Sequence, residues 1–171
     1  MEIENLFSAD QIAEANRRMA AALEDRFGCE RPVKVLVLMN GAMWFAADLL
    51  RLLPPNFMME SARVSSYGSA RETSGKVTWK TPVPYCEGKR VLVLDDVLDS
   101  GITLANVKAE LIRLGAAEVA PAVMVDKPEG RRVPVEADYV GLAAPNLFLV
   151  GYGMDADEAY RNLPYIGVVR D

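Results

Sequence analysis

The sequence of 171 residues contains no histidine. This absence excludes the Ser–His and Cys–His catalytic arrangements and the usual histidine-containing zinc sites. Only two cysteines are present, Cys29 and Cys86, and they lie far apart without the spacing of a metal site. They are therefore expected to be reduced thiols in a cytoplasmic protein. Any acid–base chemistry is left to carboxylates, lysines or tyrosines.

The chain also lacks an excess of positive charge and any long apolar segment. Its net charge of −5 argues against a general nucleic-acid-binding role, which normally needs a basic surface. No apolar run approaches the ~18 residues needed to cross a membrane. The first residues, MEIENLFSAD, have neither the basic start nor the apolar centre of a signal peptide. We therefore expect no nucleic-acid partner and no membrane association.

The most informative stretch is VLVLDDVLDSGIT, at residues 91–103. Its leading apolar residues, without polar alternation, are typical of a strand buried on both faces. Three acids and a loop around Gly101 follow, and apolar residues then recur at helical spacing up to Gly115. This order predicts a strand, an acidic loop and a helix N-terminus, which is where open α/β sheets bind ligands. The P-loop and dinucleotide-binding glycine patterns are both absent.

The residue types in this stretch indicate a class of ligand. Ser100, Gly101 and Thr103 supply backbone N–H groups and hydroxyls at the positive end of a helix, which suits a phosphate. The three preceding acids add acceptors for sugar hydroxyls, a cation or a proton. Together they predict a phosphorylated sugar bound with magnesium. The plainer alternative is a solvated acidic turn in which Asp99 or Ser100 caps the helix.

Apolar patterns and turn residues predict the remaining elements. Ser8 and Gln11 resemble a capping box that begins a helix ending at Gly28. Residues 67–76 are rich in Gly, Ser and Thr without apolar periodicity, so we expect a mobile loop. Strands are expected at residues 33–39, 57–66, 77–80, 91–94 and 119–125, and helices at residues 43–53 and 104–114.

From residue 127 onward, prolines and glycines break the chain into short pieces, with small strands expected at 139–142 and 148–152. We interpret residues 8–126 as an α/β core with a parallel sheet flanked by helices. Residues 127–171 are interpreted as a small hood over the strand ends. Because 171 residues are enough for one substantial core, a single domain spanning residues 1–171 is expected.

The motif at residues 91–103 resembles the signature of the type I phosphoribosyltransferases. Further segments resemble, in order, blocks of the hypoxanthine and hypoxanthine-guanine phosphoribosyltransferases: GAMWFAADLL, SSYGSARETSGKV, VDKPEG, ADYVGL and VGYGMDADEAYRNLPYIGVV. The resemblance implies a five-stranded parallel sheet with a hood built from both chain ends. It also implies Mg²⁺-dependent transfer of ribose 5-phosphate from phosphoribosyl pyrophosphate to a 6-oxopurine. The products are then inosine or guanosine monophosphate and pyrophosphate.

The resemblance implies roles for the acidic motif. Asp95 and Asp96 match the acids that engage the ribose hydroxyls and the magnesium shell, for which adjacent carboxylates supply hard oxygen ligands. Asp99 matches the residue beside the purine imidazole nitrogen and is the expected general base. The 5-phosphate is expected to be held by the backbone amides and hydroxyls of Asp99, Ser100, Gly101, Ile102 and Thr103.

Residues near the C-terminus are implied to bind the purine and the pyrophosphate. Lys127 matches the lysine that donates to the purine 6-oxo group, and this cation disfavours an exocyclic amine. Phe148 is expected to stack on the base, and Leu149 to supply backbone groups to its edge. Asp155 fits a second magnesium position, and Arg161 fits a bidentate pyrophosphate contact. Taken alone, Lys127 and Arg161 pass as surface residues and Phe148 as core packing.

A loop at each side of the site is also implied. Ser66 and Tyr67 match the start of a flexible loop that closes over the substrates and excludes water. Asn40 and Gly41 match the pyrophosphate loop, and the Met39–Asn40 bond falls where the family has a cis peptide.

The chain departs from the family pattern at two positions. Asn40 replaces the common Lys or Arg and brings no charge, so the affinity for pyrophosphate is expected to differ. Leu147 stands where many relatives have a polar residue beside the base. The preference among hypoxanthine, guanine and xanthine is therefore left open.

Two other function classes are left open by the sequence. One is a nucleotide-sensing, RNA-binding regulator on the same fold, although such proteins usually carry Arg where Ile102 stands. The other is a degenerate, non-catalytic interaction domain, which the three motif acids disfavour. Because oligomers are common in the family, a homodimer or homotetramer is expected.

Overall fold

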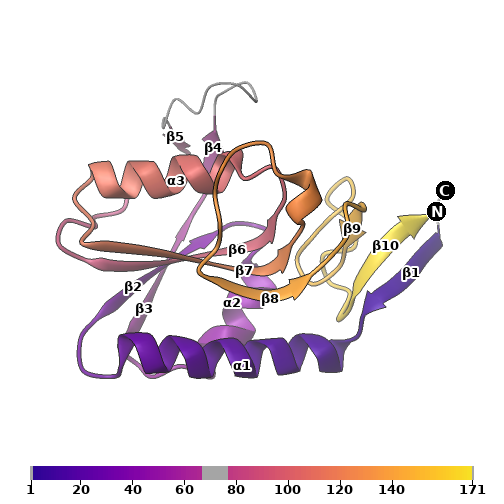
Figure 1. Cartoon of the computed structure of the whole chain (residues 1–171), viewed down its shortest axis with the longest axis horizontal. Helices are drawn as coiled ribbons and strands as arrows, with labels where there is room; N and C mark the ends of the chain where they lie inside the picture. Colours follow the sequence, from indigo (N-terminus) through magenta and orange to yellow (C-terminus); the bar gives the residue numbers. More distant parts are fainter. Residues whose placement is uncertain (1, 67–76, 171) are drawn as a thin grey trace.

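The computed structural model describes residues 2–66 and 77–170. A five-stranded parallel sheet lies at the centre, with the strand order β3-β2-β6-β7-β8 (Figure 1). This arrangement confirms the predicted α/β fold with its parallel sheet. The strands of this sheet are β2 (Val33–Leu38), β3 (Phe57–Ala62), β6 (Arg90–Leu98), β7 (Glu118–Asp126) and β8 (Tyr139–Ala143).

Helices cover both faces of the central sheet (Figure 1). Helices α1 (Ala9–Phe27) and α2 (Met43–Leu50) pack on one face, and α3 (Ile102–Arg113) packs on the other. Among the described residues, no helix is long and apolar enough to cross a membrane. Covering both faces explains why the central strands read as continuous apolar runs.

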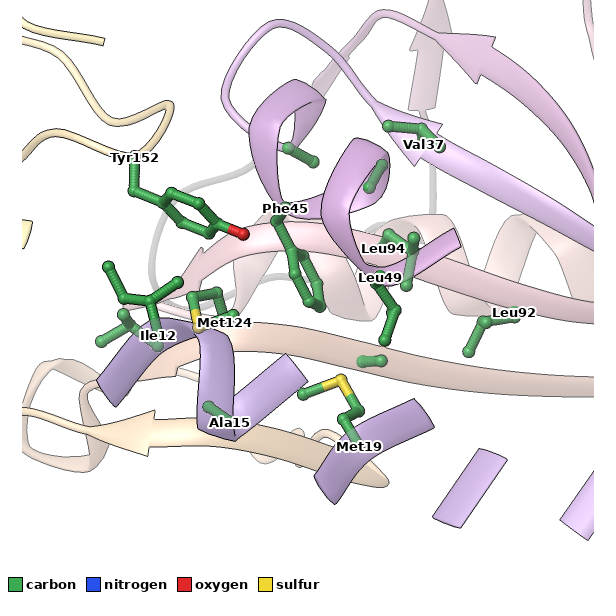
Figure 2. Packing of buried hydrophobic residues seen from close by; sticks show 14 of the residues in the cluster. Ile12, Ala15, Met19, Val37, Phe45, Leu49, Leu92, Leu94, Met124 and Tyr152 are labelled. Atoms are coloured by element: carbon green, nitrogen blue, oxygen red, sulfur yellow. The ribbon is translucent and has the colours of Figure 1, made fainter. Parts of the chain in front are cut away.

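Side chains of β6 alternate between two apolar clusters. Leu92 and Leu94 point into the cluster formed with α1 and α2, whereas Val91 and Val93 point into the cluster formed with α3. All four are fully buried. Figure 2 shows Leu94 close to Leu49 and Phe45, with Leu92 farther along the strand. The strand between them is thereby held rigidly from both sides.

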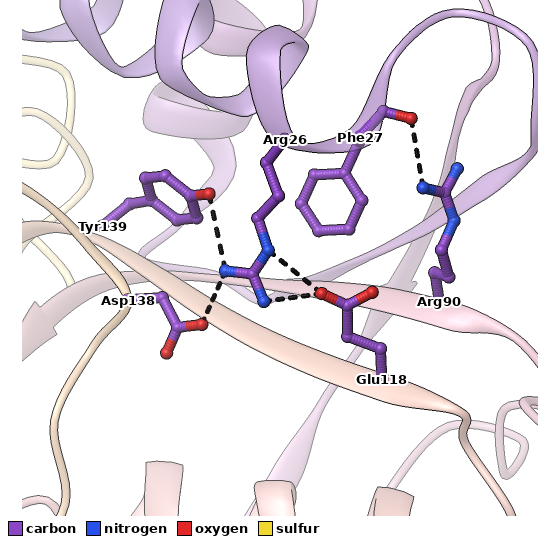
Figure 3. A network of polar contacts seen from close by, with 6 residues as sticks. All are labelled: Arg26, Phe27, Arg90, Glu118, Asp138 and Tyr139. Carbon is purple, nitrogen blue, oxygen red and sulfur yellow. Dashed lines mark hydrogen bonds and ion pairs between the residues drawn. The ribbon is translucent and has the colours of Figure 1, made fainter.

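Helix α1 begins and ends as its sequence predicts. The Gln11 N–H donates to Ser8 Oγ at 3.2 Å and the Ser8 N–H donates to Gln11 Oε1 at 2.9 Å, which completes the capping box. Gly28 ends the helix with φ of 66°. Near this end, Arg26 forms ion pairs with Glu118 at 2.6 Å and Asp138 at 2.8 Å, which join α1 to β7 and to the segment before β8 (Figure 3).

A second sheet is built from both chain ends. Strand β1 (Glu2–Phe7) pairs antiparallel with β10 (Ile166–Arg170), which also pairs antiparallel with β9 (Leu149–Val150). The two terminal strands lie side by side in Figure 1. We call this three-stranded sheet, together with residues 151–165, the hood. The sequence pattern did not predict β1 or β10 as strands.

Four sequence-based boundaries were wrong. The acidic residues Asp95 and Asp96 lie inside β6, not in a loop after it. The strand expected at 57–66 breaks at Arg63 into β3 and β4 (Val64–Ser66), and β4 pairs antiparallel with β5 (Val77–Trp79). Helix α2 ends at Leu50, three residues early, because its last residues form turns before Pro54-Pro55.

The fourth error concerns the hood boundary. Residues from 127 onward were interpreted as hood, but β8 pairs in parallel with β7 and belongs to the central sheet. Its sequence pattern is weak because it is an edge strand that is only partly buried. The core therefore extends to Ala143.

The double-sided packing of β6 leads to a stability prediction. Leu92→Ala is expected to lower the free energy of unfolding by about 2–5 kcal/mol, because it removes a fully buried side chain and leaves a cavity. Ile112→Ala is the matched control, since Ile112 is 56% exposed on α3. Urea unfolding monitored by circular dichroism measures both. Equal, small losses would contradict the assigned core.

Candidate functional site

The loops that follow the parallel strands gather at one edge of the central sheet. Because β2, β6, β7 and β8 all run in the same direction, their carboxyl ends meet there. Gly41 follows β2, Asp99 follows β6, Lys127 follows β7 and Phe148 follows β8. Side chains that are far apart in the sequence therefore converge.

Two adjacent acids lie in the last half of β6, before its final residues Val97 and Leu98. The Asp96 N–H donates to Asp95 Oδ1 at 3.0 Å, and the Val97 N–H donates to Asp96 Oδ1 at 2.8 Å. Burial raises the pKa of Asp95 well above its ordinary value, and the neighbouring Asp96 raises it further. Burial also raises the pKa of Asp96. The hydrogen bonds that its carboxyl accepts and the charge of Arg161 lower this pKa, but the effect of burial is larger. The protein thus holds two carboxyls where their charged forms are disfavoured.

A close approach packs the loop after β2 against these acids. A Cβ atom on Gly41 would lie 2.0 Å from Asp96 Oδ2, so a side chain there would displace the Asp96 carboxylate. On the other side, a Cβ atom on Gly153 of the hood would lie 1.9 Å from the Gly41 carbonyl oxygen. The Met39–Asn40 peptide bond is cis, as the resemblance implies. The hood, the loop after β2 and the acidic pair are therefore in direct contact.

A cavity of about 290 Å³ opens at this point, and we call it the acidic cavity. The three motif acids line it, together with Gly41 and Arg161. The turn after β6 contributes Ser100, Gly101 and Thr103, and α3 begins directly behind this turn. Ile102 is partly buried and does not line the cavity, although it belongs to the same turn. Carboxylates and a helix N-terminus suit a phosphorylated sugar.

A second cavity, of about 190 Å³, adjoins the first, and we call it the aromatic cavity. Lys127, Phe148, Leu149 and Asp155 line it. Phe148 is 59% exposed, so its side chain is not core packing, whereas Leu149 is buried. The aromatic cavity shares Asp96, Val97 and Asp99 with the acidic cavity. An exposed ring beside a lysine suits a flat, polar base.

Asp99 and Lys127 form an ion pair between the two cavities. The distance from Lys127 Nζ to Asp99 Oδ2 is 2.7 Å. The Lys127 side chain is only 8% exposed, whereas that of Asp99 is 48% exposed. The buried position rules out the plain interpretation of Lys127 as a surface lysine. Asp99 remains open to both cavities while its partner holds one of its oxygens.

Arg161 and Asp155 form a second ion pair, within the hood. Arg161 Nη2 lies 2.9 Å from Asp155 Oδ1, and Nη1 donates to the Gly153 carbonyl at 2.6 Å. Arg161 lines the acidic cavity, whereas Asp155 lines the aromatic cavity. Arg161 is therefore the cation placed toward the acids in the described part of the chain, and it is not an ordinary surface residue.

Not every predicted site residue joins the cavities. Asn40 is exposed and is not part of the lining of the acidic cavity. Ser66 is the last residue of β4, and Tyr67 with the loop at 68–76 lies outside the described residues. Leu147 packs against the main core and is not part of the lining of the aromatic cavity.

The sequence did not point to a hydrogen-bonded link beneath the hood. The Tyr152 hydroxyl donates to Asp48 Oδ2 at 2.7 Å and accepts from Asn16 Nδ2 at 2.9 Å. Figure 2 shows the Tyr152 hydroxyl oxygen pointing toward α2. Burial, and then the bond to Asp48, raises the pKa of Tyr152. An acid in the otherwise apolar stretch FAADLL was the one sequence signal for this link.

Metal binding by the protein alone is not indicated. Within residues 2–66 and 77–170, no cluster of three or more His, Cys, Asp or Glu side chains is arranged to hold an ion. Asp95 and Asp96 supply two carboxylates, and Asp155 is paired with Arg161. Two carboxylates suit Mg²⁺, which usually takes its other ligands from water and substrate phosphates.

Comparison with known proteins agrees with this geometry. The family model described as the phosphoribosyl transferase domain matches residues 2–157. The hypoxanthine-guanine phosphoribosyltransferase of Streptococcus pneumoniae (strain ATCC BAA-255 / R6) is 40% identical over 167 residues, which cover 97% of this chain and 92% of that protein. The enzyme of the same name from Bacillus subtilis (strain 168) is 38% identical, with 96% and 92% covered.

Solved structures give the same assignment. The crystal structure of a hypoxanthine-guanine phosphoribosyltransferase from Bacillus anthracis matches with a TM-score of 0.90 and 36% sequence identity. The match covers 99% of this chain and 100% of that one. The chain therefore belongs to the phosphoribosyltransferase family and, within it, to the hypoxanthine-guanine phosphoribosyltransferases of purine salvage.

Proposed function

We propose that this enzyme transfers the 5-phosphoribosyl group from phosphoribosyl pyrophosphate to hypoxanthine or guanine, giving IMP or GMP and pyrophosphate. The observation that carries this proposal is the position of Asp99 between the acidic and the aromatic cavity. The matched relatives are named as enzymes, which favours catalysis over the RNA-binding regulator that the sequence left open.

Each cavity is proposed to take one substrate. The 5-phosphate binds the amides and hydroxyls of the turn at residues 99–103, and the ribose hydroxyls face Asp95 and Asp96. The purine enters the aromatic cavity against Phe148. Because the cavities share Asp96 and Asp99, the two substrates meet there in a fixed orientation. Such positioning accounts for a large part of the rate of a bimolecular reaction.

Asp99 and Lys127 are proposed to act on the purine as a pair. In the transfer, the bond from ribose C1 to the pyrophosphate oxygen breaks and a bond from C1 to a purine imidazole nitrogen forms. Asp99 accepts the proton that the purine imidazole loses, and Lys127 donates to the 6-oxo group. An oxopurine thus gives each partner of the 2.7 Å ion pair a new contact, whereas an adenine amine repels the ammonium.

The departing pyrophosphate is proposed to leave past Arg161 and Gly41. Arg161 supplies positive charge to the acidic cavity, and its planar guanidinium suits bidentate phosphate contacts. Asp95 and Asp96 are proposed to hold Mg²⁺ together with the substrate, and the donor set of two adjacent carboxylates fits that ion. When bound, Mg²⁺ neutralises negative charge on the pyrophosphate. Its presence also compensates the two carboxylates whose charged forms burial disfavours.

The role of Asp99 is tested by Asp99→Asn. This change removes the proton acceptor and leaves a side chain of the same shape, so kcat is expected to fall by about 10²–10⁴. Initial rates of IMP formation with saturating substrates measure the effect. The exposed Asp25 provides the control variant, Asp25→Asn. A kcat near the wild-type value would remove Asp99 from this role.

The role of Lys127 is tested by Lys127→Met, which keeps the length of the side chain but removes its charge. The KM for hypoxanthine is expected to rise about tenfold or more, because a hydrogen bond from a charged donor is lost. Discrimination against adenine should weaken in the same variant. Lys80→Met, at an exposed position, is the control. Unchanged affinity for the oxopurine would show that the aromatic cavity is not the purine site.

The acidic pair leads to a prediction about stability. Because folding raises the pKa of Asp95, the stability it contributes is present below its unfolded pKa, near 3.8, and is lost as the pH rises. Asp95→Asn removes this loss. In Mg²⁺-free urea unfolding between pH 4 and pH 7, the variant is expected to gain free energy relative to wild type by up to about 1.4 kcal/mol per pH unit. The control variant Asp25→Asn should show no such gain in the free energy of unfolding. If Asp95→Asn and wild type depend on pH in the same way, the raised pKa of Asp95 is contradicted.

A further inference from the structure

The segment 127–133 forms hydrogen bonds to three consecutive carbonyl groups of the turn after β6. The Lys127 N–H donates to the Leu98 carbonyl at 2.9 Å, and the Arg132 N–H donates to the Ser100 carbonyl at 2.9 Å. Between them, the Arg131 side chain donates from Nη1 to the Asp99 carbonyl at 2.8 Å and to the Leu98 carbonyl at 3.2 Å. The carbonyls of residues 98–100 therefore all face the segment 127–133.

This arrangement decides where the amides of the turn point. In a trans peptide the N–H of the next residue points away from the C=O of the preceding one. Directing the carbonyls of residues 98–100 toward the segment 127–133 turns the N–H groups of residues 99–101 to the opposite side. Ser100 and Gly101 line the acidic cavity. Arg131 thus orients, through the backbone, the groups proposed to bind the 5-phosphate.

Arg131 is itself held in place by the central sheet. Its Nη2 lies 2.5 Å from Asp126 Oδ1, and the two side chains are 18% and 20% exposed. Asp126 is the last residue of β7 and is the register partner of Leu98 in β6. A Cβ atom on Gly101 would lie 3.0 Å from Arg131 Cδ, so the turn also packs on the aliphatic part of the arginine. Charge, hydrogen bonds and packing converge on one side chain.

We propose that Arg131, anchored by Asp126, is a positioning residue that preorganises the amides of the turn for the 5-phosphate. The inference rests on the proposed function, which assigns the 5-phosphate to this turn. Arg131 touches the turn from the side opposite the acidic cavity and acts through it. Preorganised amides bind an anion without first having to reorient, so loss of Arg131 should weaken phosphate binding selectively. The Lys127–Asp99 ion pair does not pass through Arg131 and should persist.

The experiment compares the full-length wild type with Arg131→Met, Arg131→Lys and Arg132→Met. Binding of ribose 5-phosphate is measured by calorimetry, and KM is measured for phosphoribosyl pyrophosphate and for hypoxanthine. For Arg131→Met, the Kd of ribose 5-phosphate and the KM of phosphoribosyl pyrophosphate are expected to rise about tenfold or more. The KM of hypoxanthine should stay within about threefold, because the side-chain ion pair of Lys127 with Asp99, which is proposed to bind it, is formed without Arg131.

The other two variants separate positioning from general stability. Arg131→Lys should recover part of the affinity, because an ammonium reaches one carbonyl but lacks the fork that spans two acceptors. Arg132 is the matched control, since its exposed side chain lies beside Arg131 and only its backbone bonds the turn. Arg132→Met should bind ribose 5-phosphate like wild type. Equal weakening of hypoxanthine and ribose 5-phosphate in Arg131→Met would overturn the inference.

Two further measurements keep the outcomes distinct. If the backbone amide resonances of Ser100 and Gly101 do not shift when wild type binds ribose 5-phosphate, the proposed phosphate site itself is wrong. If they shift while Arg131→Met binds as tightly as wild type, only the role of Arg131 is wrong. Should Arg131→Met fail to fold, Asp126→Ala decides, because it keeps Arg131 but removes the carboxylate that anchors it. A rise in the Kd of ribose 5-phosphate then supports the inference, and an unchanged Kd overturns it.

Discussion

The parallel pairing of β6 between β2 and β7 is the constraint on which the site depends. Apolar side chains of β6 are buried in clusters on both faces of the sheet, so the strand cannot shift its register without exposing one set of them. The same register places Asp95 and Asp96 in the last half of β6 and directs Asp99 into the turn beyond it. The two cavities inherit their geometry from this rigid strand.

The site also contains groups that lower the stability of the folded state. Burial disfavours the charged forms of Asp95 and Asp96, and an arrangement chosen for stability alone would replace them with apolar side chains. Natural enzymes commonly tolerate such local costs where function requires them. Here the cost is borne within β6, directly after four fully buried residues, Val91–Leu94.

The hood supplies what the central sheet lacks. It contributes Leu149 and Asp155 to the aromatic cavity and Arg161 to the acidic one, and Phe148 stands directly before β9. The hood is joined to the core by the contact between Gly153 and Gly41 and by the bonds of Tyr152 to Asp48 and Asn16. Since its two long strands come from opposite ends of the chain, the hood sheet forms only when the two termini pair.

Local sequence was sufficient for the strand and turn at residues 91–103, because a continuous apolar run and a helix start are properties of neighbouring residues. The capping box of α1 followed for the same reason. Local sequence did not predict β1 and β10, whose partners lie at the far end of the chain, nor the place of the edge strand β8 in the central sheet. Local sequence also did not predict the ion pair of Lys127 with Asp99 or the hydrogen bonds of Arg131 to the turn, which only the tertiary structure shows. Such contacts form because the carboxyl ends of parallel strands lie side by side in the folded sheet, and a pattern of neighbouring residues carries no information about that arrangement.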